Sequence, residues 1–333
     1  MESHLPILVT GAAGFIGART CECLLEAGHR VLGIDNVNAA YDPLLKQIRL
    51  EDLERLDGFA FEALDIEDAA AVDRLFHRQQ FGAVVNLAAR AGVRASMEQP
   101  QAYIGTNVTG CLHLLEAMRR HEIRKMVLAS TSSLYAGQPT PFREDQPVDR
   151  PISPYAATKK AAEAMAYTYH HLYGLDVSIT RFFTVFGPRG RPDMAVFRFI
   201  QGILQGAPLQ IYGDGTQERD FTYIDDIASG VVAALRPVGY EIFNLGRGDR
   251  PVSVNALIEC LENALGQKAD VIHHPAHQAD MHATLADPAK ARRLLGWEPR
   301  WDPFDGFRQT VRWHLAYRER LSQRSGPATA ATG

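Results

Sequence analysis

The feature that most constrains the fold of this chain is a glycine-rich turn between a strand and a helix near the N-terminus. The apolar run Leu5–Thr10 is typical of a buried strand, and it leads into Gly11-Ala-Ala-Gly14-Phe15-Ile16-Gly17, where a helix begins. Such a turn brings backbone N–H groups and a helix N-terminus against a diphosphate, and side chains at the glycine positions would block that approach. The turn therefore predicts the first unit of a dinucleotide-binding fold.

Strands and helices continue to alternate after this turn. Further strands are expected at Arg30–Asp35, Phe59–Leu64, Ala83–Leu87, Lys125–Ser130 and Val177–Arg181. Helices are expected at Phe15–Ala27, Ala69–Gln79, Ala102–His121 and Tyr155–Tyr173. This order predicts an α/β fold with a doubly wound, parallel Rossmann sheet, because each parallel strand needs a crossover helix. We assign residues 1–183 mainly to this dinucleotide-binding domain.

The second half of the chain is less regular and contains many Gly, Pro and Asp turns. Helices are expected at Ala195–Gln205 and Val254–Leu265, and strands at Leu209–Tyr212 and Glu241–Leu245. We assign residues 184–320 mainly to a smaller substrate-binding cap, with some segments returning to the main sheet. Residues 321–333 are small and polar, and we expect a disordered tail.

Composition excludes several functional classes. The formal net charge of −4 and the lack of Lys/Arg runs argue against a nucleic-acid partner. No apolar stretch is long enough for a bilayer span, and no signal peptide is recognisable, so we expect a cytoplasmic protein without a membrane partner. The four cysteines lack the spacing of a metal site or a disulfide framework.

The ends of the second, third and fourth strands indicate which dinucleotide is bound. Asp35 follows the glycine turn by about 20 residues, where a carboxylate accepts hydrogen bonds from the adenosine ribose and repels the 2′-phosphate of NADP. We therefore expect NAD as the cofactor. Asn36, directly after Asp35, is a further candidate for a cofactor contact. The adenine ring would meet the end of the third strand, and small residues at the end of the fourth strand would let the backbone approach the cofactor, although ordinary strand ends would look the same. These candidates are Asp65, Ile66, Leu87, Ala88 and Ala89.

Acid/base equipment follows the fifth strand. Ser130, Thr131, Ser132 and Ser133 end that strand, and Tyr155 and Lys159 open the next long helix. Residues at i and i+4 share one helical face, so the ammonium would stabilise the phenolate and lower the pKa of Tyr155. A hydroxyl from the Ser/Thr run would share the substrate proton. A solvated helix face is the alternative interpretation of the Tyr/Lys pair taken alone.

Together these motifs resemble the extended short-chain dehydrogenases, specifically the NAD-dependent sugar-nucleotide epimerases, from about residue 5 to residue 315. The resemblance implies a bound NAD that takes a hydride from C4 of the sugar and returns it. It implies that Thr131 assists Tyr155, and that Ser130, Asn107 and Phe182 join the cofactor shell. Arg219 would bind the nucleotide diphosphate, and Tyr212 would pack on the uracil. It also implies a homodimer built on the helices at 102–121 and 155–173, although these could simply pack on the sheet.

Three segments narrow the resemblance to the UDP-glucuronate 4-epimerases: residues 88–96, 183–188 and 190–194. Thr184 and Arg191 would bind the sugar carboxylate, because arginine pairs with carboxylates through charge-assisted hydrogen bonds. Arg94 is a further candidate, unless it only caps its own loop. The remaining expected substrate contacts are Ser132, Ser133, Met194 and, facing the nucleotide, Asp280.

Four other functions remain as alternatives. A UDP-glucose 4-epimerase would use the same chemistry on a neutral sugar. A UDP-glucuronate decarboxylase would need an acid near Tyr155 to protonate C5, and a dehydratase would need an Asp–Glu pair where Ser132 and Ser133 stand. A non-enzymatic NAD sensor would not need Tyr155 and Lys159. No metal is expected: the histidines at 273, 274, 277 and 282 lack the order of a metal site.

Overall fold

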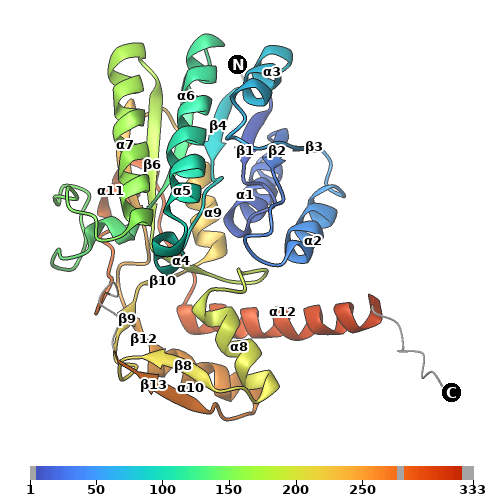
Figure 1. Ribbon diagram of the computed structural model, residues 1–333, viewed down its shortest axis with the longest axis vertical. Helices are drawn as coiled ribbons and strands as arrows, with labels where there is room; N and C mark the ends of the chain where they lie inside the picture. Colours follow the sequence, from blue (N-terminus) through green and yellow to red (C-terminus); the bar gives the residue numbers. More distant parts are fainter. Residues whose placement is uncertain (1–4, 276–280, 325–333) are drawn as a thin grey trace.

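The computed structural model describes residues 5–275 and 281–324, with the main sheet at its centre (Figure 1). The sheet has seven strands in the order β11-β6-β5-β4-β1-β2-β3, and every pairing is parallel. The predicted doubly wound Rossmann α/β fold is confirmed. The strands are β1 (Ile7–Thr10), β2 (Val31–Asp35), β3 (Phe59–Ala63), β4 (Ala83–Asn86), β5 (Lys125–Thr131), β6 (Asp176–Phe182) and β11 (Tyr240–Leu245).

Helices cover both faces of this sheet, as alternation of side chains along β1 shows. Ile7 and Val9 belong to the apolar cluster beneath α1 (Phe15–Glu26) and α9 (Ile224–Ala233), with α2 (Pro43–Leu53) beside α1. Leu8 points to the other cluster. That second cluster lies beneath α3 (Ala69–Arg78), α6 (Cys111–Arg120) and α7 (Pro154–Tyr173). Strands covered on both faces explain the unbroken apolar runs of the sequence.

The helix predicted over 102–121 is confirmed as an unbroken helical segment that ends at Arg120, but it is not a regular α-helix throughout. The segment contains the end of α5 (Pro100–Ile104), a π-helical stretch (Gly105–Gly110) and α6, with the short α4 (Val93–Glu98) before them. A π-helical turn widens the helix by one residue, and such turns are frequent at functional sites. Its sequence contains two glycines, two threonines and Asn107, none of which favours a regular helix interior.

The second half of the chain builds three small two-stranded sheets below the main sheet (Figure 1). They pair β7 (Thr184–Phe186) with β10 (Phe221–Tyr223), β8 (Leu209–Tyr212) with β13 (Val271–His274), and β9 (Glu218–Arg219) with β12 (Val252–Ser253). The helices α8 (Ala195–Gln205), α10 (Val254–Leu265) and α12 (Pro303–Arg324) accompany them, whereas α11 (Ala289–Leu295) packs against β11 of the main sheet. Helix α12 extends four residues into the tail expected at 321–333, and the rest of that tail lies outside the described residues.

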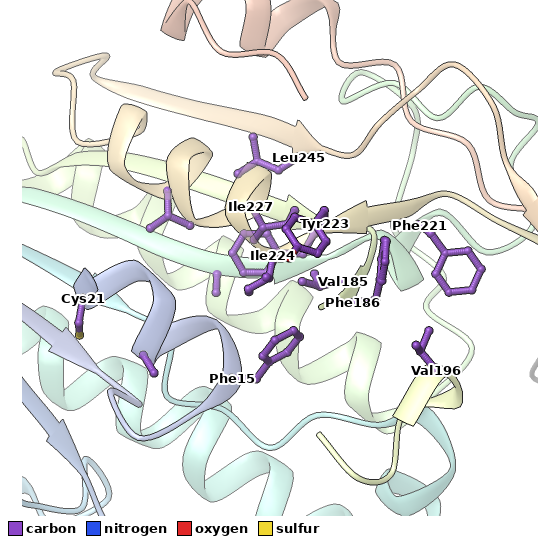
Figure 2. Close-up of a cluster of buried hydrophobic side chains, with 14 of the residues drawn as sticks. Phe15, Cys21, Val185, Phe186, Val196, Phe221, Tyr223, Ile224, Ile227 and Leu245 are labelled. Carbon is purple, nitrogen blue, oxygen red and sulfur yellow. The ribbon is translucent and has the colours of Figure 1, made fainter. Parts of the chain in front are cut away.

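Two segments of the second half return to the first. Strand β11 pairs with β6 at the edge of the main sheet, and α9 packs against α1. Figure 2 shows the resulting apolar cluster, in which Phe15 of α1 lies close to Ile224, Val185 and Phe186. The two halves therefore share one hydrophobic core. Within the described part of the chain, no helix is long and apolar enough to cross a membrane.

Candidate active site

The glycine turn lies directly above the carboxyl ends of β1 and β4. Gly11 has φ +70°, and a Cβ there would lie 2.7 Å from the backbone nitrogen of Ala88. A Cβ on Gly17 would lie 2.0 Å from the carbonyl oxygen of Gly11. The N-cap of α1 is Gly14, which has no side chain to cap the first backbone N–H groups. The cradle fits a diphosphate at the helix N-terminus, as expected for Gly11, Gly14, Phe15, Ile16 and Gly17.

Asp35 ends β2 and is buried. Its Oδ1 accepts hydrogen bonds from the backbone N–H of Val37 at 2.7 Å and from Lys46 at 3.3 Å. The motif analysis missed Lys46, whose spacing from Asp35 carried no signal by itself. Asn36 donates to Asp65 at 2.7 Å, so the ends of β2 and β3 are joined beside the expected adenosine position. The arrangement fits an adenosine ribose that would hydrogen-bond to Asp35 beside these partners. Ile66, which follows Asp65 in the sequence, is buried.

The segment after β4 is fixed by side-chain bonds to its backbone. Thr10 at the end of β1 donates to Asn86 at 2.7 Å and accepts from the N–H of Ala88 at 3.0 Å. Asn107, from the π-helical stretch, binds both the N–H and the carbonyl of Arg90, at 2.9 and 3.0 Å. These bonds place Leu87, Ala88 and Ala89 beside the glycine turn. Asn107 therefore positions this loop, and its expected contact with the cofactor remains a prediction.

Tyr155 and Thr131 meet where β5 ends and α7 begins, and Lys159 lies one helical turn farther along α7. Tyr155 shares a hydrogen bond with the side chain of Thr131. Lys159 is buried, and its ammonium donates to the carbonyl of Ala129 at 2.9 Å. Thr131 also accepts from the backbone N–H of Ser133 at 3.2 Å, which fixes its hydroxyl at the end of the strand. The structure therefore brings Tyr155 and Thr131 together, whereas Lys159 is bonded to the backbone of β5.

The predicted lowering of the Tyr155 pKa is wrong for the protein without ligand. Burial raises the pKa of Tyr155 and outweighs the hydrogen bond with Thr131 and the charge of Arg191, which both lower it. Burial also lowers the pKa of Lys159 to about 8, against the opposing effect of Cys111 and Glu163. Lys159 is therefore a weaker source of positive charge than its spacing suggested, because desolvation disfavours a buried ammonium.

Behind Tyr155 lies a buried polar network that the motif analysis missed. Arg181 of β6 makes two bonds to Glu163 of α7, at 2.9 and 2.8 Å, and both side chains are 1% exposed. Ser130 donates to the same carboxylate at 2.7 Å. Arg181 also donates to Tyr135, which in turn donates to Asn244 at 2.8 Å. Glu163 lies at i+4 from Lys159, and that spacing was the available signal.

Ser130 is thus occupied away from the cleft, and its expected cofactor contact remains a prediction. Phe182, at the end of β6, belongs to the apolar core that joins the two halves. Ser132 is buried, whereas Ser133 is partly exposed within the short 3-10 helix Ser132–Tyr135. The Ser/Thr run therefore divides into a buried anchor, Ser130, and the group at Thr131 that meets Tyr155.

The expected carboxylate-binding residues lie at the start of β7 and on the loop between β7 and α8. Thr184 opens β7, and its N–H donates to the carbonyl of Asp220 at 3.1 Å. The guanidinium of Arg191 pairs with Asp193 and donates to the carbonyl of Ala91 at 3.3 Å. The same carbonyl of Ala91 accepts a hydrogen bond from Tyr103, whose ring meets that of Tyr155, so Arg191 lies near the acid/base group. Met194 is the N-cap residue of α8, directly after this loop.

Tyr103 is a further residue near Tyr155 that the motif analysis missed. The two rings meet edge to face with centroids 6.1 Å apart. The hydroxyl of Tyr103 donates to the carbonyls of Ala91 and Gly92, at 3.1 and 3.0 Å. Tyr103 and Arg191 therefore both donate hydrogen bonds to the carbonyl of Ala91 and fix the loop that contains it.

Two of the expected nucleotide contacts, Tyr212 and Arg219, belong to the second half of the chain, and Arg94, a candidate for the sugar carboxylate, lies against the first of them. The guanidinium of Arg94, on α4, lies 4.0 Å from the ring centre of Tyr212 at the end of β8. Arg219, on β9, donates to the carbonyls of Glu218 and His282 at 2.8 and 3.4 Å. Asp280 lies outside the described residues. The structure brings Arg94 and Tyr212 together, and a uracil stacked on that face of Tyr212 would replace the guanidinium.

Two of the histidines considered for a metal site have other roles in the structure. His273 bonds to the carbonyl of Gly213 at 2.7 Å, and His274 bonds to Gln210 at 2.5 Å. Over residues 5–275 and 281–324, no group of three or more His, Cys, Asp or Glu side chains could hold a metal ion. His277 lies outside those ranges.

The chain was compared with known proteins. The NAD dependent epimerase/dehydratase family matches residues 7–246. A UDP-glucuronate 4-epimerase of Thermodesulfobacterium geofontis is 55% identical over 306 residues, covering 92% of this chain and 95% of that protein. The predicted resemblance to the epimerases is confirmed, and so is the NAD dependence that it implied.

Solved structures agree with this assignment. A UDP-glucuronic acid 4-epimerase of Bacillus cereus, in complex with UDP-glucuronic acid and NAD, has a TM-score of 0.88 and 36% identity, covering 94% of this chain and all (100%) of that one. A UDP-glucose 4-epimerase of Thermus thermophilus, in complex with NAD, has a TM-score of 0.83 and 31% identity, covering 93% and 99%. With its glycine turn, its acid/base group and these relatives, the chain belongs to the NAD dependent epimerase/dehydratase family.

Proposed function

We propose that this chain is a UDP-glucuronate 4-epimerase, which interconverts UDP-glucuronate and UDP-galacturonate with NAD. The observation that carries the proposal is the placement of Arg191 on the carbonyl of Ala91, which also binds Tyr103, the ring neighbour of the tyrosine that would act on C4. A guanidinium there suits a sugar with a carboxylate at C5. The 55% identity to a UDP-glucuronate 4-epimerase over most of both chains supports the same substrate.

Tyr155 would be the acid/base at the 4-hydroxyl. As phenolate it accepts the hydroxyl proton, and Thr131, already bonded to it, orders the substrate oxygen. NAD, when bound, accepts the C4 hydride and returns it. Because burial raises the pKa of Tyr155 in the free protein, proton removal needs further positive charge in the cleft, and the oxidised nicotinamide carries such a charge.

The carboxylate explains why loop residues matter. A 4-keto uronate is a β-keto acid, and it loses CO₂ when the bond between C5 and C6 aligns with the carbonyl π system. Thr184 and Arg191 would hold the carboxylate out of that alignment. Arg191 must first exchange its bonds to Asp193 for bonds to the substrate. The sugar can then turn over and receive the hydride on its opposite face.

The alternatives explain fewer of these features. A UDP-glucose 4-epimerase would leave Arg191 without an anionic sugar group to bind. In a decarboxylase an acid would stand near Tyr155 to protonate C5, whereas the carboxylate behind Tyr155, Glu163, is fully engaged with Arg181 and Ser130. A non-enzymatic NAD sensor would not need the bond between Tyr155 and Thr131.

We further propose a homodimer in the cytoplasm. Apolar side chains on α5 and α7 are exposed in the single chain, including Ile104, Leu172 and Tyr173, and a second copy would cover them. All four cysteines are free, as suits a reducing compartment. Light scattering coupled to size-exclusion chromatography would give twice the chain mass for the dimer and the chain mass for a monomer.

The test of the activity uses two substrates. The purified protein is incubated separately with UDP-glucuronate and UDP-glucose, and the C4 epimers are resolved by chromatography. We expect UDP-galacturonate from the first and little UDP-galactose from the second. UDP-pentose and CO₂ without UDP-galacturonate would instead identify a decarboxylase. Preferential conversion of UDP-glucose would identify the neutral-sugar enzyme.

A further inference from the structure

Arg49 of α2 and Arg181 are the largest fully buried side chains in the described structure, and Arg49 has no carboxylate among its hydrogen-bond acceptors. Its guanidinium donates to the carbonyl of Ala13 at 3.0 Å, the hydroxyl of Tyr41 at 2.6 Å and the carbonyl of Arg189 at 2.6 Å. Within the described residues its Nε has no hydrogen-bond partner. Burial lowers the pKa of this arginine. A buried guanidinium whose hydrogen bonds all go to neutral groups is costly for stability.

The acceptors of Arg49 belong to two functional loops. Ala13 lies inside the glycine turn, between Gly11 and Gly14. Arg189 lies two residues before Arg191, and the carbonyl of Gly190 is within 3.5 Å of the same guanidinium nitrogen. One side chain therefore joins the turn that would hold the cofactor diphosphate to the loop that would hold the sugar carboxylate.

The second of these loops requires such an anchor because its backbone is unfavourable. Arg189 has φ +60°, which is uncommon for a residue with a side chain. Its own side chain pairs with Glu22 of α1 at 2.6 Å and approaches Asp52 of α2 at 3.8 Å. These outer ion pairs hold the side chain of Arg189. Arg49, in contrast, holds the backbone that leads into Arg191.

We infer that Arg49 is a positioning residue that fixes Arg191 relative to the cofactor turn and so controls the fate of the 4-keto intermediate. The inference depends on the proposed function, because only a uronate can divide between two outcomes. With the carboxylate restrained, the hydride returns and the epimer forms. With it released, the bond from C5 to C6 breaks, CO₂ leaves and C5 takes a proton. The products are then UDP-4-keto-pentose, CO₂ and NADH.

The geometry requires a guanidinium at this position. Its planar fork directs separate N–H groups to Ala13, Tyr41 and Arg189 at once, whereas a lysine ammonium is a point charge on a flexible stem. Arg49→Lys would retain the positive charge but not the fixed distance between the two loops. Arg49→Met would remove both. Small displacements of a binding group change the outcome strongly, because a misplacement of about 1 Å can cost on the order of 100-fold in rate.

The experiment measures a partition ratio: UDP-4-keto-pentose formed per UDP-galacturonate from UDP-glucuronate. Both products arise from one intermediate, so the ratio does not depend on the fraction of folded protein. We expect Arg49→Lys and Arg49→Met to raise it between about 10-fold and 100-fold. Arg191→Ala should raise it similarly. Arg189→Ala is the matched control, because it removes the outer ion pairs and keeps the carbonyl that Arg49 binds, and its ratio should stay near that of the wild type.

Two results would overturn the inference. One is a wild-type ratio in both Arg49 variants, even if their turnover is slower, which would make Arg49 a purely structural residue. The other is an equal rise in Arg189→Ala, which would show that any anchor of the loop has the same effect. A wild-type protein that makes no UDP-galacturonate would instead overturn the proposed function, and this outcome is seen before any variant is tested.

Discussion

The acid/base group and the carboxylate loop are built in different ways, although they lie close together. Tyr155 and Lys159 lie on a 20-residue helix, against strands β5 and β6, with the buried Glu163–Arg181 pair behind them. Arg191 lies on a loop, where its guanidinium pairs with an exposed aspartate. Precise proton and hydride transfer requires a rigid support, whereas substrate choice can be changed by moving a loop. The comparison predicts that variants in the first region lose turnover or stability, and that variants in the second change the product.

The largest effect is expected for Tyr155→Phe. The substitution keeps the ring against Tyr103 and removes the hydroxyl that exchanges the C4 proton. We expect kcat to fall between about 100-fold and 10,000-fold, the range of a positioned acid/base group. Epimerisation of UDP-glucuronate is measured by chromatography of the C4 epimers. Tyr167→Phe, at an exposed position on the same helix, is the control and should retain wild-type turnover. Retention of activity in Tyr155→Phe would remove Tyr155 from the mechanism.

The second largest effect is expected for Glu163→Gln, which tests the rigid support itself. The neutral amide leaves Arg181 charged and buried with a poorer partner, and breaking a buried pair typically costs about 3–5 kcal/mol. Urea unfolding measures the free energy. Asp305→Asn is the control: it breaks an exposed pair with Arg308, and such pairs contribute at most about 1 kcal/mol. Equal losses of unfolding free energy in the two variants would mean that the buried network behind Tyr155 stabilises the fold no more than an exposed ion pair does.

The sequence predicted the first of these regions better than the second. Its strands and helices have the period and length that mark them, so the parallel sheet and the meeting of Tyr155 with Thr131 could be anticipated. What it could not give was the pKa of Tyr155. Spacing shows that Lys159 lies on the same face, but only the structure shows that burial weakens the lysine and disfavours the phenolate.

The second half of the chain, which contains the carboxylate loop, was harder to predict for a physical reason. Strands of two to four residues, such as β9 and β12, are too short to show a period, and their pairing joins residues far apart in the chain. Arg191 was identified through resemblance, but its present partner Asp193 and its support from Arg49 depend on tertiary contacts. The π-helical stretch was missed because its two glycines and Asn107 serve a local packing that no helical pattern encodes.

A smaller effect, dependent on pH, is expected at His314 of α12, in the core of the second half of the chain. The ring is 4% exposed and packs edge to face on Phe197 at 4.7 Å. Burial, with a contribution from Arg318, lowers its pKa from 6.5 to about 4. Between these values the unfolded chain binds a proton that the folded chain does not. Stability is therefore lost as pH falls below 6.5, up to about 3 kcal/mol below pH 4.

His314→Phe should remove this part of the acid sensitivity. Urea unfolding at pH 7.5 and pH 5.5 measures how much free energy of unfolding each protein loses between the two values. We expect the wild type to lose about 1 kcal/mol more than the variant. His29→Phe, at an exposed position, is the control for loss of a histidine. Equal losses of unfolding free energy in wild type and His314→Phe would show that the second half of the chain tolerates a protonated, buried His314. The buried Arg181 behind Tyr155 is, in contrast, paired with Glu163.

The smallest effect on turnover is expected for Thr184→Val, which separates product choice from turnover. Valine keeps the shape and the backbone bond to Asp220 but removes the hydroxyl expected at the sugar carboxylate. Loss of one hydrogen bond to a charged group costs about 1.5–3 kcal/mol, so we expect UDP-4-keto-pentose per UDP-galacturonate to rise by about 10-fold or more, with oxidation of C4 little changed. Thr180→Val, which removes a buried hydroxyl from β6, is the control and should leave the ratio unchanged. If Thr184→Val instead slows the oxidation of C4 and leaves the ratio unchanged, the carboxylate loop belongs to the rigid catalytic unit, and the contrast between the two regions fails.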